Sequence, residues 1–111
     1  MDITFRTKKL AKICNDGKEA SATLGPEQAR RLRQRLDDLR AASSLQVMVS
    51  LPGRTHELKG DRKGELSIDL KHPYRLIFVP SANPVPTKND GGLDWAAVHA
   101  VEILEIVDTH V

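Results

Sequence analysis

Cysteine and aromatic residues are scarce in this chain of 111 residues. The single cysteine, Cys14, excludes an internal disulfide, and no spacing of Cys and His resembles a zinc site, so we expect neither a metal nor a cofactor. Aromatic residues account for 4% of the chain, which leaves Leu, Ile and Val to form the core. No apolar run is long enough to span a membrane or to form a signal peptide. We therefore expect a cytoplasmic protein without a membrane partner.

Basic residues are almost absent from the last third of the chain. Residues 1–75 carry 16 Lys and Arg against 10 Asp and Glu, whereas residues 76–111 carry 1 against 5. A basic face for an anionic partner such as nucleic acid would give this asymmetry. A solvated, arginine-rich helix face would give it equally well, so charge alone leaves both interpretations open.

The order of the expected elements indicates a single α+β domain over residues 1–111. Residues 2–5 alternate like a short strand, and a first helix is expected from Thr7 until "NDGKEASATLGPE" interrupts it. Apolar residues recur at helical spacing over residues 26–42, with Pro26 at the helix start. Four further strands are expected over residues 54–58, 65–70, 74–79 and 97–108. The sequence therefore predicts an N-terminal strand, two or three helices and a four-stranded antiparallel sheet, with the helices on one face.

Two segments resist a simple assignment. Residues 45–53 fit either a strand or a helix, because apolar residues recur there at steps of two and of three. Residues 80–94 are too rich in Pro, Gly and Asn for regular structure, and a loop of that length is usually functional or mobile. The strand over residues 65–70 is clearer, since its alternation places Ser67 and Asp69 on the polar side, opposite the core.

No nucleophile-elbow, Walker or HExxH motif is present, and the basic and histidine residues gather instead between residues 54 and 79. The segments "HELKGDRKGELSIDL", "YRLIF" and "ILEIVDTH" together resemble the HigB-type killer toxins of the RelE/ParE superfamily. The resemblance covers the whole order of elements and is most specific over residues 54–79. It implies a RelE/ParE-like fold and a ribosome-dependent endoribonuclease that cuts mRNA, held silent by a helix-turn-helix antitoxin of the HigA type.

The resemblance also implies roles for individual residues. His56 corresponds to the strand histidine of these toxins, and Asp108 and His110 correspond to their terminal acid and histidine. The expected catalytic residues are His56, Arg75, Asp108 and His110. The expected RNA-binding residues are Arg54, Lys59, Arg62, Lys63 and Lys71.

These residue types suit RNA cleavage without a metal, in which the ribose 2′-OH attacks the next phosphate. Histidine serves as base or acid near neutral pH, and His56 and His110 are candidates for the two roles in either order. Arg75 and Lys59 would stabilise charge on the phosphoryl oxygens, because cationic N–H groups bind such oxygens strongly. Asp108 would orient His110.

Other functions also fit the sequence. Thr109 stands where the resembled toxins carry tyrosine, and Asp69 stands where their strand carries a base. These differences favour a toxin-fold protein without nuclease activity, such as the gyrase-directed branch of the superfamily or a degenerate toxin. The chain could also be the neutralising member of a toxin–antitoxin pair, although it shows neither a helix-turn-helix nor a disordered tail. In a purely structural role, His56 would bond to a neighbouring backbone group and Lys59 would belong to a solvated hairpin tip.

Overall fold

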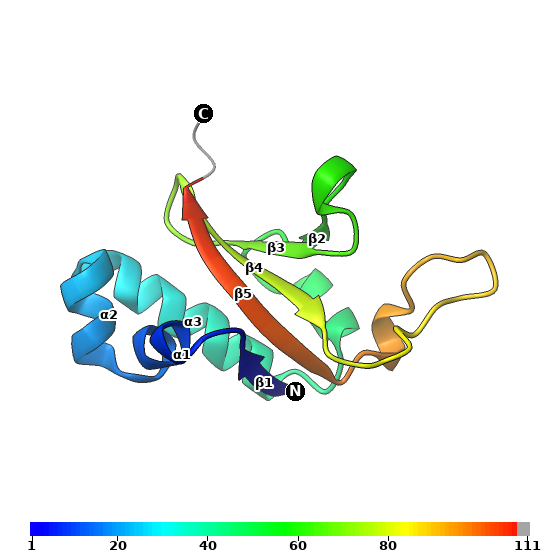
Figure 1. Ribbon diagram of the computed structural model, residues 1–111, viewed down its shortest axis with the longest axis horizontal. Helices are drawn as coiled ribbons and strands as arrows, with labels where there is room; N and C mark the ends of the chain where they lie inside the picture. The colour runs from blue at the N-terminus through cyan, green and yellow to red at the C-terminus, as the bar shows by residue number, and fades with distance from the viewer. Residues whose placement is uncertain (109–111) are drawn as a thin grey trace.

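The computed structural model describes residues 1–108, in which three helices lie beside a five-stranded sheet (Figure 1). The helices are α1 (Lys8–Asn15), α2 (Gly17–Leu24) and α3 (Pro26–Ala41). The strands are β1 (Asp2–Phe5), β2 (His56–Glu57), β3 (Leu66–Asp69), β4 (Tyr74–Pro80) and β5 (Ala100–Asp108). Short 3-10 helices occur at η1 (Leu45–Ser50), η2 (Gly60–Arg62) and η3 (Trp95–Ala97). The α+β class expected from the sequence is confirmed.

The sheet has the strand order β1-β5-β4-β3-β2 and is mixed. Strands β2 to β5 pair in antiparallel fashion, as predicted. The expected strand at the start of the chain also joins this sheet, where it pairs parallel to β5 with Asp2 opposite Ala100. The sheet therefore has five strands rather than four. Alternation predicts that a strand exists, but it carries no signal for pairing with a strand at the far end of the chain.

The interruption expected after the first helix is a single residue rather than a loop. α1 begins as predicted, with the hydroxyl of Thr7 accepting from the N–H of Leu10 at 3.1 Å. Asp16 alone separates α1 from α2, and its carboxylate accepts from the N–H of Lys18 at 3.0 Å. Asp16 is thus an N-cap, which explains why a second helix follows at once. Gly25, with φ of 85°, then ends α2 and precedes α3.

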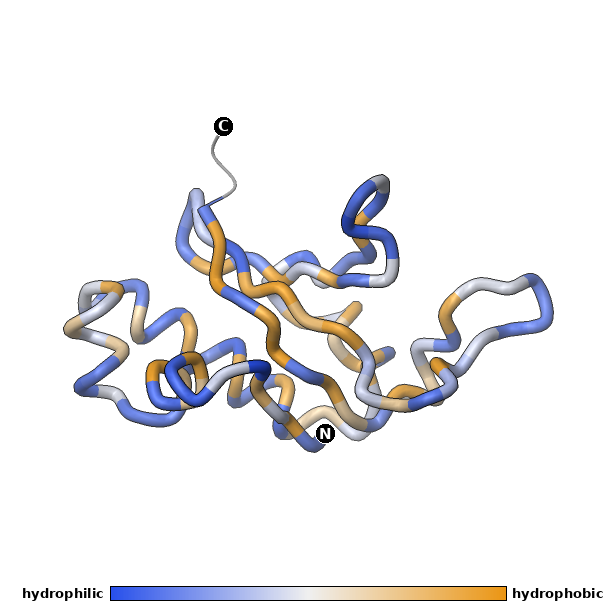
Figure 2. The backbone as a smooth tube through the Cα atoms, viewed as in Figure 1, coloured by the Kyte–Doolittle hydropathy of each residue, from blue (hydrophilic) through white to orange (hydrophobic). Residues whose placement is uncertain are grey.

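The apolar stripe of α3 packs against one face of the sheet, called here the inner face. Leu36 of α3 and Phe78 of β4 are both 0% exposed in this core. Figure 2 shows apolar residues concentrated along the central strands, next to α3. The core residues from α3, η1 and the sheet are Leu32, Leu36, Leu39, Leu45, Met48, Leu66, Ile68, Leu76, Phe78, Val101 and Ile103.

Three boundaries differ from those expected. Residues 45–53 contain the 3-10 helix η1, so neither the strand nor a regular α-helix is formed there. β2 is shorter than expected because Gly53 (φ 115°) and Arg54 (φ 50°) adopt left-handed backbone angles that a strand does not continue. β5 begins later than expected because η3 occupies the preceding residues.

The start of the chain is tied to the end of α3. The amino group of Met1 donates to the carbonyl oxygens of Leu39 at 3.0 Å, Arg40 at 2.8 Å and Ala42 at 2.6 Å. Carbonyls at a helix C-terminus lack intrahelical partners and carry partial negative charge, so a positive amino group is favourable there. This contact holds the residue that precedes β1 against the end of α3.

Candidate functional site

The outer face of the sheet, turned away from α3, carries several of the predicted site residues. His56 lies opposite Ser67 on neighbouring strands, and Asp69 lies opposite Arg75. Alternation along β5 brings Glu105 to the same side. Directly paired residues point to the same side of a sheet, so residues from β2, β3, β4 and β5 share this face.

Asp69 is the centre of the cluster on the outer face. Its carboxylate accepts from Nε of Arg54 at 2.7 Å and from Nη2 of Arg54 at 3.3 Å, and Nε of Arg75 lies 3.6 Å away. Its backbone N–H donates to the carbonyl of Gly53 at 2.7 Å, and its carbonyl accepts from Nε of Arg35 at 2.9 Å. Both the backbone and the side chain of Asp69 are thus engaged, and Asp69 holds Arg54 and Arg75 at one place.

Arg35 of α3 contacts this cluster through its hydrogen bond to the carbonyl of Asp69. It is only 7% exposed, and burial lowers the pKa of its guanidinium, with the neighbouring charge of Arg31 acting in the same direction. Gly53 lies directly against it: a Cβ atom at Gly53 would sit 3.0 Å from Nε of Arg35 and 2.7 Å from Cγ1 of Ile68. A side chain at Gly53 would therefore displace the group that holds the carbonyl of Asp69.

His56 lies next to the cluster and is oriented by a backbone group. Its Nδ1 is 2.6 Å from the carbonyl oxygen of Arg54. Because a carbonyl only accepts, Nδ1 carries the hydrogen, and Nε2 is the nitrogen of the neutral ring that can accept a proton. The structural role considered for His56 is therefore observed, and it fixes the tautomer that a general base needs.

Arg62 crosses the outer face from the hairpin tip to β5. Its Nη1 lies 2.7 Å from Oε1 of Glu65, and its Nη2 lies 3.5 Å from Oε1 of Glu105. These carboxylates raise the pKa of Arg62, chiefly through the hydrogen bond with Glu65. Ser67 and Ile77, which lie in register between the hairpin and β5, are buried on this side. Ser67 lies on the side opposite the core residues Leu66 and Ile68, as the alternation predicts, but it is 0% exposed.

The three predicted RNA-binding lysines do not gather around Asp69. Lys71 follows β3, and its ammonium pairs with Glu27 at the start of α3. Its backbone also bonds to Gln28, with the amide of Gln28 donating to the Lys71 carbonyl at 3.0 Å. Lys59 and Lys63 are exposed on the hairpin tip, and neither forms an ion pair within residues 1–108. Of the expected RNA-binding residues, only Arg54 and Arg62 lie with His56 and Arg75.

The expected residues of the C-terminal segment are only partly placed. Asp108 is the last residue of β5 and lies opposite Tyr74, one position beyond the pair formed by Val107 and Arg75. His110 lies outside the described residues. A cavity of about 60 Å³ next to the Asp69 cluster is lined by Arg54, Asp69, Leu70, His72, Pro73, Tyr74 and Arg75.

The acids that pair with the arginines were not among the expected site residues. Asp69 and Glu105 both alternate with apolar neighbours in "ELSIDL" and "ILEIVD", which is enough to place them on a polar face. Their pairing with Arg54 and Arg62 depends on the left-handed turn before β2 and on the fold of the hairpin tip. Alternation could thus have found the acids but not their partners.

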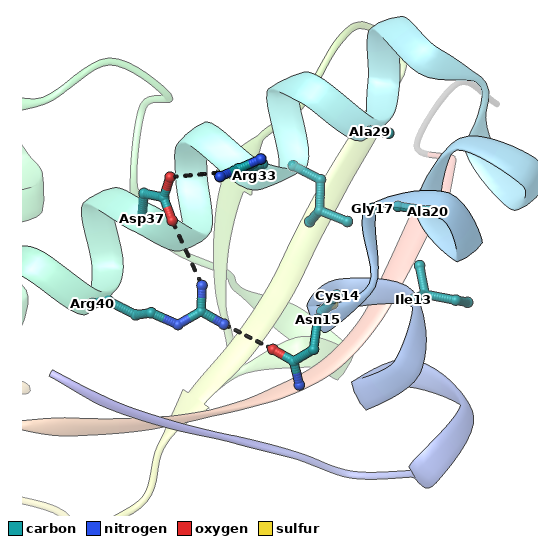
Figure 3. Close-up of a pocket in the computed structure, with 10 residues that line it drawn as sticks. Ile13, Cys14, Asn15, Gly17, Ala20, Ala29, Arg33, Asp37 and Arg40 are labelled. Carbon is teal, nitrogen blue, oxygen red and sulfur yellow. Dashed lines mark hydrogen bonds and ion pairs between the residues drawn. The ribbon is translucent and has the colours of Figure 1, made fainter.

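A second cavity, of about 400 Å³, lies among the three helices (Figure 3). Arg40 donates to Oδ1 of Asn15 at 2.9 Å and lies 3.7 Å from Asp37, which is 3.9 Å from Arg33. Cys14 also lines this cavity, and burial raises the pKa of its thiol to about 11. A thiol with that pKa stays protonated near neutral pH, so Cys14 is a packing residue rather than a nucleophile.

Within residues 1–108, no three or more His, Cys, Asp or Glu side chains are grouped so that they could hold a metal ion. In the same residues, no helix is long and apolar enough to cross a membrane.

Comparison with protein-family models finds no match, and neither does comparison with curated protein sequences. Solved structures do match. A YoeB/ParE toxin from Agrobacterium tumefaciens has a TM-score of 0.59 at 11% identity and covers 99% of this chain and 100% of its own. The chain has a toxin fold of the YoeB/ParE type. Two Staphylococcus aureus structures agree, the YoeB–YefM complex (TM-score 0.57, 13% identity) and the YoeB dimer (TM-score 0.55, 14% identity), each covering 100% of this chain and 98% of its own.

The YoeB/ParE toxin fold is thus shared over the full set of elements, including the helices and the sheet. The RelE/ParE-like fold expected from the sequence is confirmed by this match. At identities of 11–14%, the structural match shows the fold alone. Any function must be argued from the residues of this chain.

Proposed function

We propose that this chain is the toxin of a type II toxin–antitoxin pair, of the HigB type, and that it cleaves mRNA on the ribosome. The cluster of His56 with two arginines on the outer face of a YoeB/ParE toxin fold is the observation that carries the proposal. Its mechanism would be attack of a ribose 2′-OH on the adjacent phosphate, without a metal or cofactor.

The geometry suits that reaction at two points. Nε2 of His56 would take the proton of the 2′-OH, since Nδ1 is committed to the carbonyl of Arg54. Arg75 and Arg54 would exchange the carboxylate of Asp69 for the phosphoryl oxygens, on which charge builds during the reaction. Asp108 and His110 keep their proposed roles as orienting acid and second proton carrier.

The partners proposed are a HigA-type helix-turn-helix antitoxin, mRNA and the ribosome, in the cytoplasm. A complex with YefM is known for the Staphylococcus aureus YoeB protein of similar fold, which supports a protein partner for this chain. A ribosomal site would help a small protein to position its message, because affinity for RNA depends mostly on phosphate contacts.

Primer extension on cellular mRNA after induction of the chain tests this function. We expect growth arrest and discrete cuts within codons of translated messages. His56→Ala and Arg75→Ala should each lower cleavage by about a hundredfold or more, as expected for loss of a base or of charge stabilisation. Lys18→Ala, an exposed change on α2, is the control. Full cleavage and growth arrest in His56→Ala, Arg75→Ala and His110→Ala would contradict the proposal.

A toxin without nuclease activity is the second candidate. It is favoured by the ion pairs of the outer face, since Arg54, Arg62 and Arg75 each have a carboxylate partner. Such a face is closer to neutral than an RNA-binding surface usually is. A gyrase-directed or degenerate toxin would arrest growth with stalled replication and leave mRNA uncut in the same induction experiment.

A further inference from the structure

A groove separate from the Asp69 cluster lies between the hairpin tip that joins β2 to β3 and the loop of residues 81–94. Its volume is about 570 Å³. Aliphatic residues from both sides line it: Leu58, Pro80, Val85 and Leu93. In Figure 1 this loop extends away from the sheet, at the end of the molecule opposite α2.

The loop that forms one wall of the groove is held by its own hydrogen bonds. Thr87 and Leu93 form an isolated antiparallel bridge, and the N–H of Asp94 donates to the carbonyl of Pro86 at 3.0 Å. These contacts make a small hairpin that presents apolar side chains to the groove. Val85 is 45% exposed and contributes an accessible aliphatic side chain to the lining of the groove.

Two of the three charged residues that line the groove are lysines. Lys59 and Lys63 lie on its hairpin side, are exposed and form no ion pair within residues 1–108. Glu57 is the acidic residue of the lining, and its carboxylate already accepts from the indole N–H of Trp95 at 3.0 Å. The described lining thus combines two lysines with aliphatic residues, and its one acidic residue already accepts a hydrogen bond.

Three features decide what fits this groove. No residue of its described lining is aromatic, so the stacking platform that an unpaired RNA base uses is lacking. β2, which borders the groove, is the outermost strand of the sheet, and such an edge pairs readily with an added extended segment. Aliphatic walls and paired lysines complement aliphatic side chains alternating with carboxylates.

We propose that this groove binds an extended, acidic segment of a second protein, whose aliphatic side chains enter between the hairpin tip and the 81–94 loop. Lys59 and Lys63 contact the carboxylates of that segment. This surface is distinct from the outer face, and its function does not require that the outer face cleaves RNA.

Fluorescence polarisation with the full chain and a labelled peptide of alternating glutamate and leucine tests the proposal. We expect saturable binding. Val85→Asp should weaken it by about tenfold or more, and so should the double variant Lys59→Glu with Lys63→Glu; a tenfold change in affinity corresponds to about 1.4 kcal/mol. Val49→Asp, at another exposed valine, and Lys9→Glu with Lys18→Glu, on α1 and α2, are matched controls that should bind as the parent does. Far-ultraviolet circular dichroism confirms that each variant is folded.

Several outcomes would overturn the proposal. The first is absence of saturable binding, and the second is equal weakening by the control variants. A third is tighter binding of oligouridylate RNA that the groove variants abolish, because the occupant would then be RNA. A fourth is a dimer, seen by light scattering, that Val85→Asp dissociates, because the groove would then be filled by a second copy.

Discussion

The two faces of the sheet differ in how their residues are satisfied. On the inner face, Leu36 and Phe78 are fully buried among apolar neighbours. On the outer face, Asp69 and Arg75 are half-buried and are satisfied by each other and by Arg54, which has a left-handed backbone. Ser67 on that face is buried, and its hydroxyl has no hydrogen-bond partner among the described residues. The inner face stabilises the fold, whereas the outer face keeps groups in arrangements that stability alone would not select.

Truncation of the largest core side chain should give the largest effect. Phe78→Ala removes a fully buried ring from the inner face and should lower the free energy of unfolding by about 3–5 kcal/mol. Val79→Ala, the next residue on β4 and half-buried on the outer face, should cost about 1 kcal/mol. Urea unfolding followed by circular dichroism measures both. Equal losses would mean that the outer face contributes as much packing as the inner face.

Cys14 tests how closely the inner side is packed at α1. Burial raises the pKa of its thiol from 9.0 to about 11, so the thiolate fraction at pH 8 should be about a hundredfold below that of a free cysteine. Alkylation by iodoacetamide should be slower by a similar factor and should accelerate as pH rises toward 11. A rate at pH 8 equal to that of free cysteine would show that the helices do not exclude solvent from this thiol.

Asp69→Asn tests whether the outer face is held neutral by its own carboxylate. The change removes one negative charge between Arg54 and Arg75, and we expect affinity for a short labelled RNA to rise by about tenfold at low salt. The loss of stability should be below about 1 kcal/mol, as is usual for ion pairs near the surface. Asp37→Asn is the matched control, because Asp37 also lies between two arginines, on α3. If RNA affinity rose equally in both variants, the change in net charge alone would explain the rise, and the position of Asp69 would not matter.

The smallest effect is expected at the ion pair between Glu27 and Lys71, which joins α3 to the end of β3. The hydrogen bond from Lys71 lowers the pKa of Glu27 below its ordinary value of 4.5. Because the folded-state pKa is the lower one, this stabilisation is present above pH 4.5 and is lost as pH falls through the folded-state value. Glu27→Gln should therefore shift the urea midpoint slightly at pH 7, and the shift should shrink as pH falls below 4.5. A shift that stays constant as pH falls below 4.5 would show that another contact of Glu27 is responsible.

The sequence predicted features that depend on a pattern within one helix or strand, and it missed features that depend on contacts between distant segments. The stripe of α3 and the alternation of β3 are repeated over one element, and both were found in their expected places. At Asp16 the sequence predicts a loop, because one acidic residue before glycine fits a loop as well as a helix cap. The cluster at Asp69 was missed because it joins the turn at Gly53, the buried Arg35 and a strand, which are brought together only by the tertiary fold.

The parallel pairing of β1 with β5 has a consequence for the order in which the elements fold. All three helices and strands β2 to β4 lie between β1 and β5 in the sequence, so the pairing of β1 with β5 closes a long loop. Helices α1 to α3 depend on contacts between sequence neighbours and need no such closure. We therefore expect β1 to join the sheet after the helices and the hairpins between them have formed.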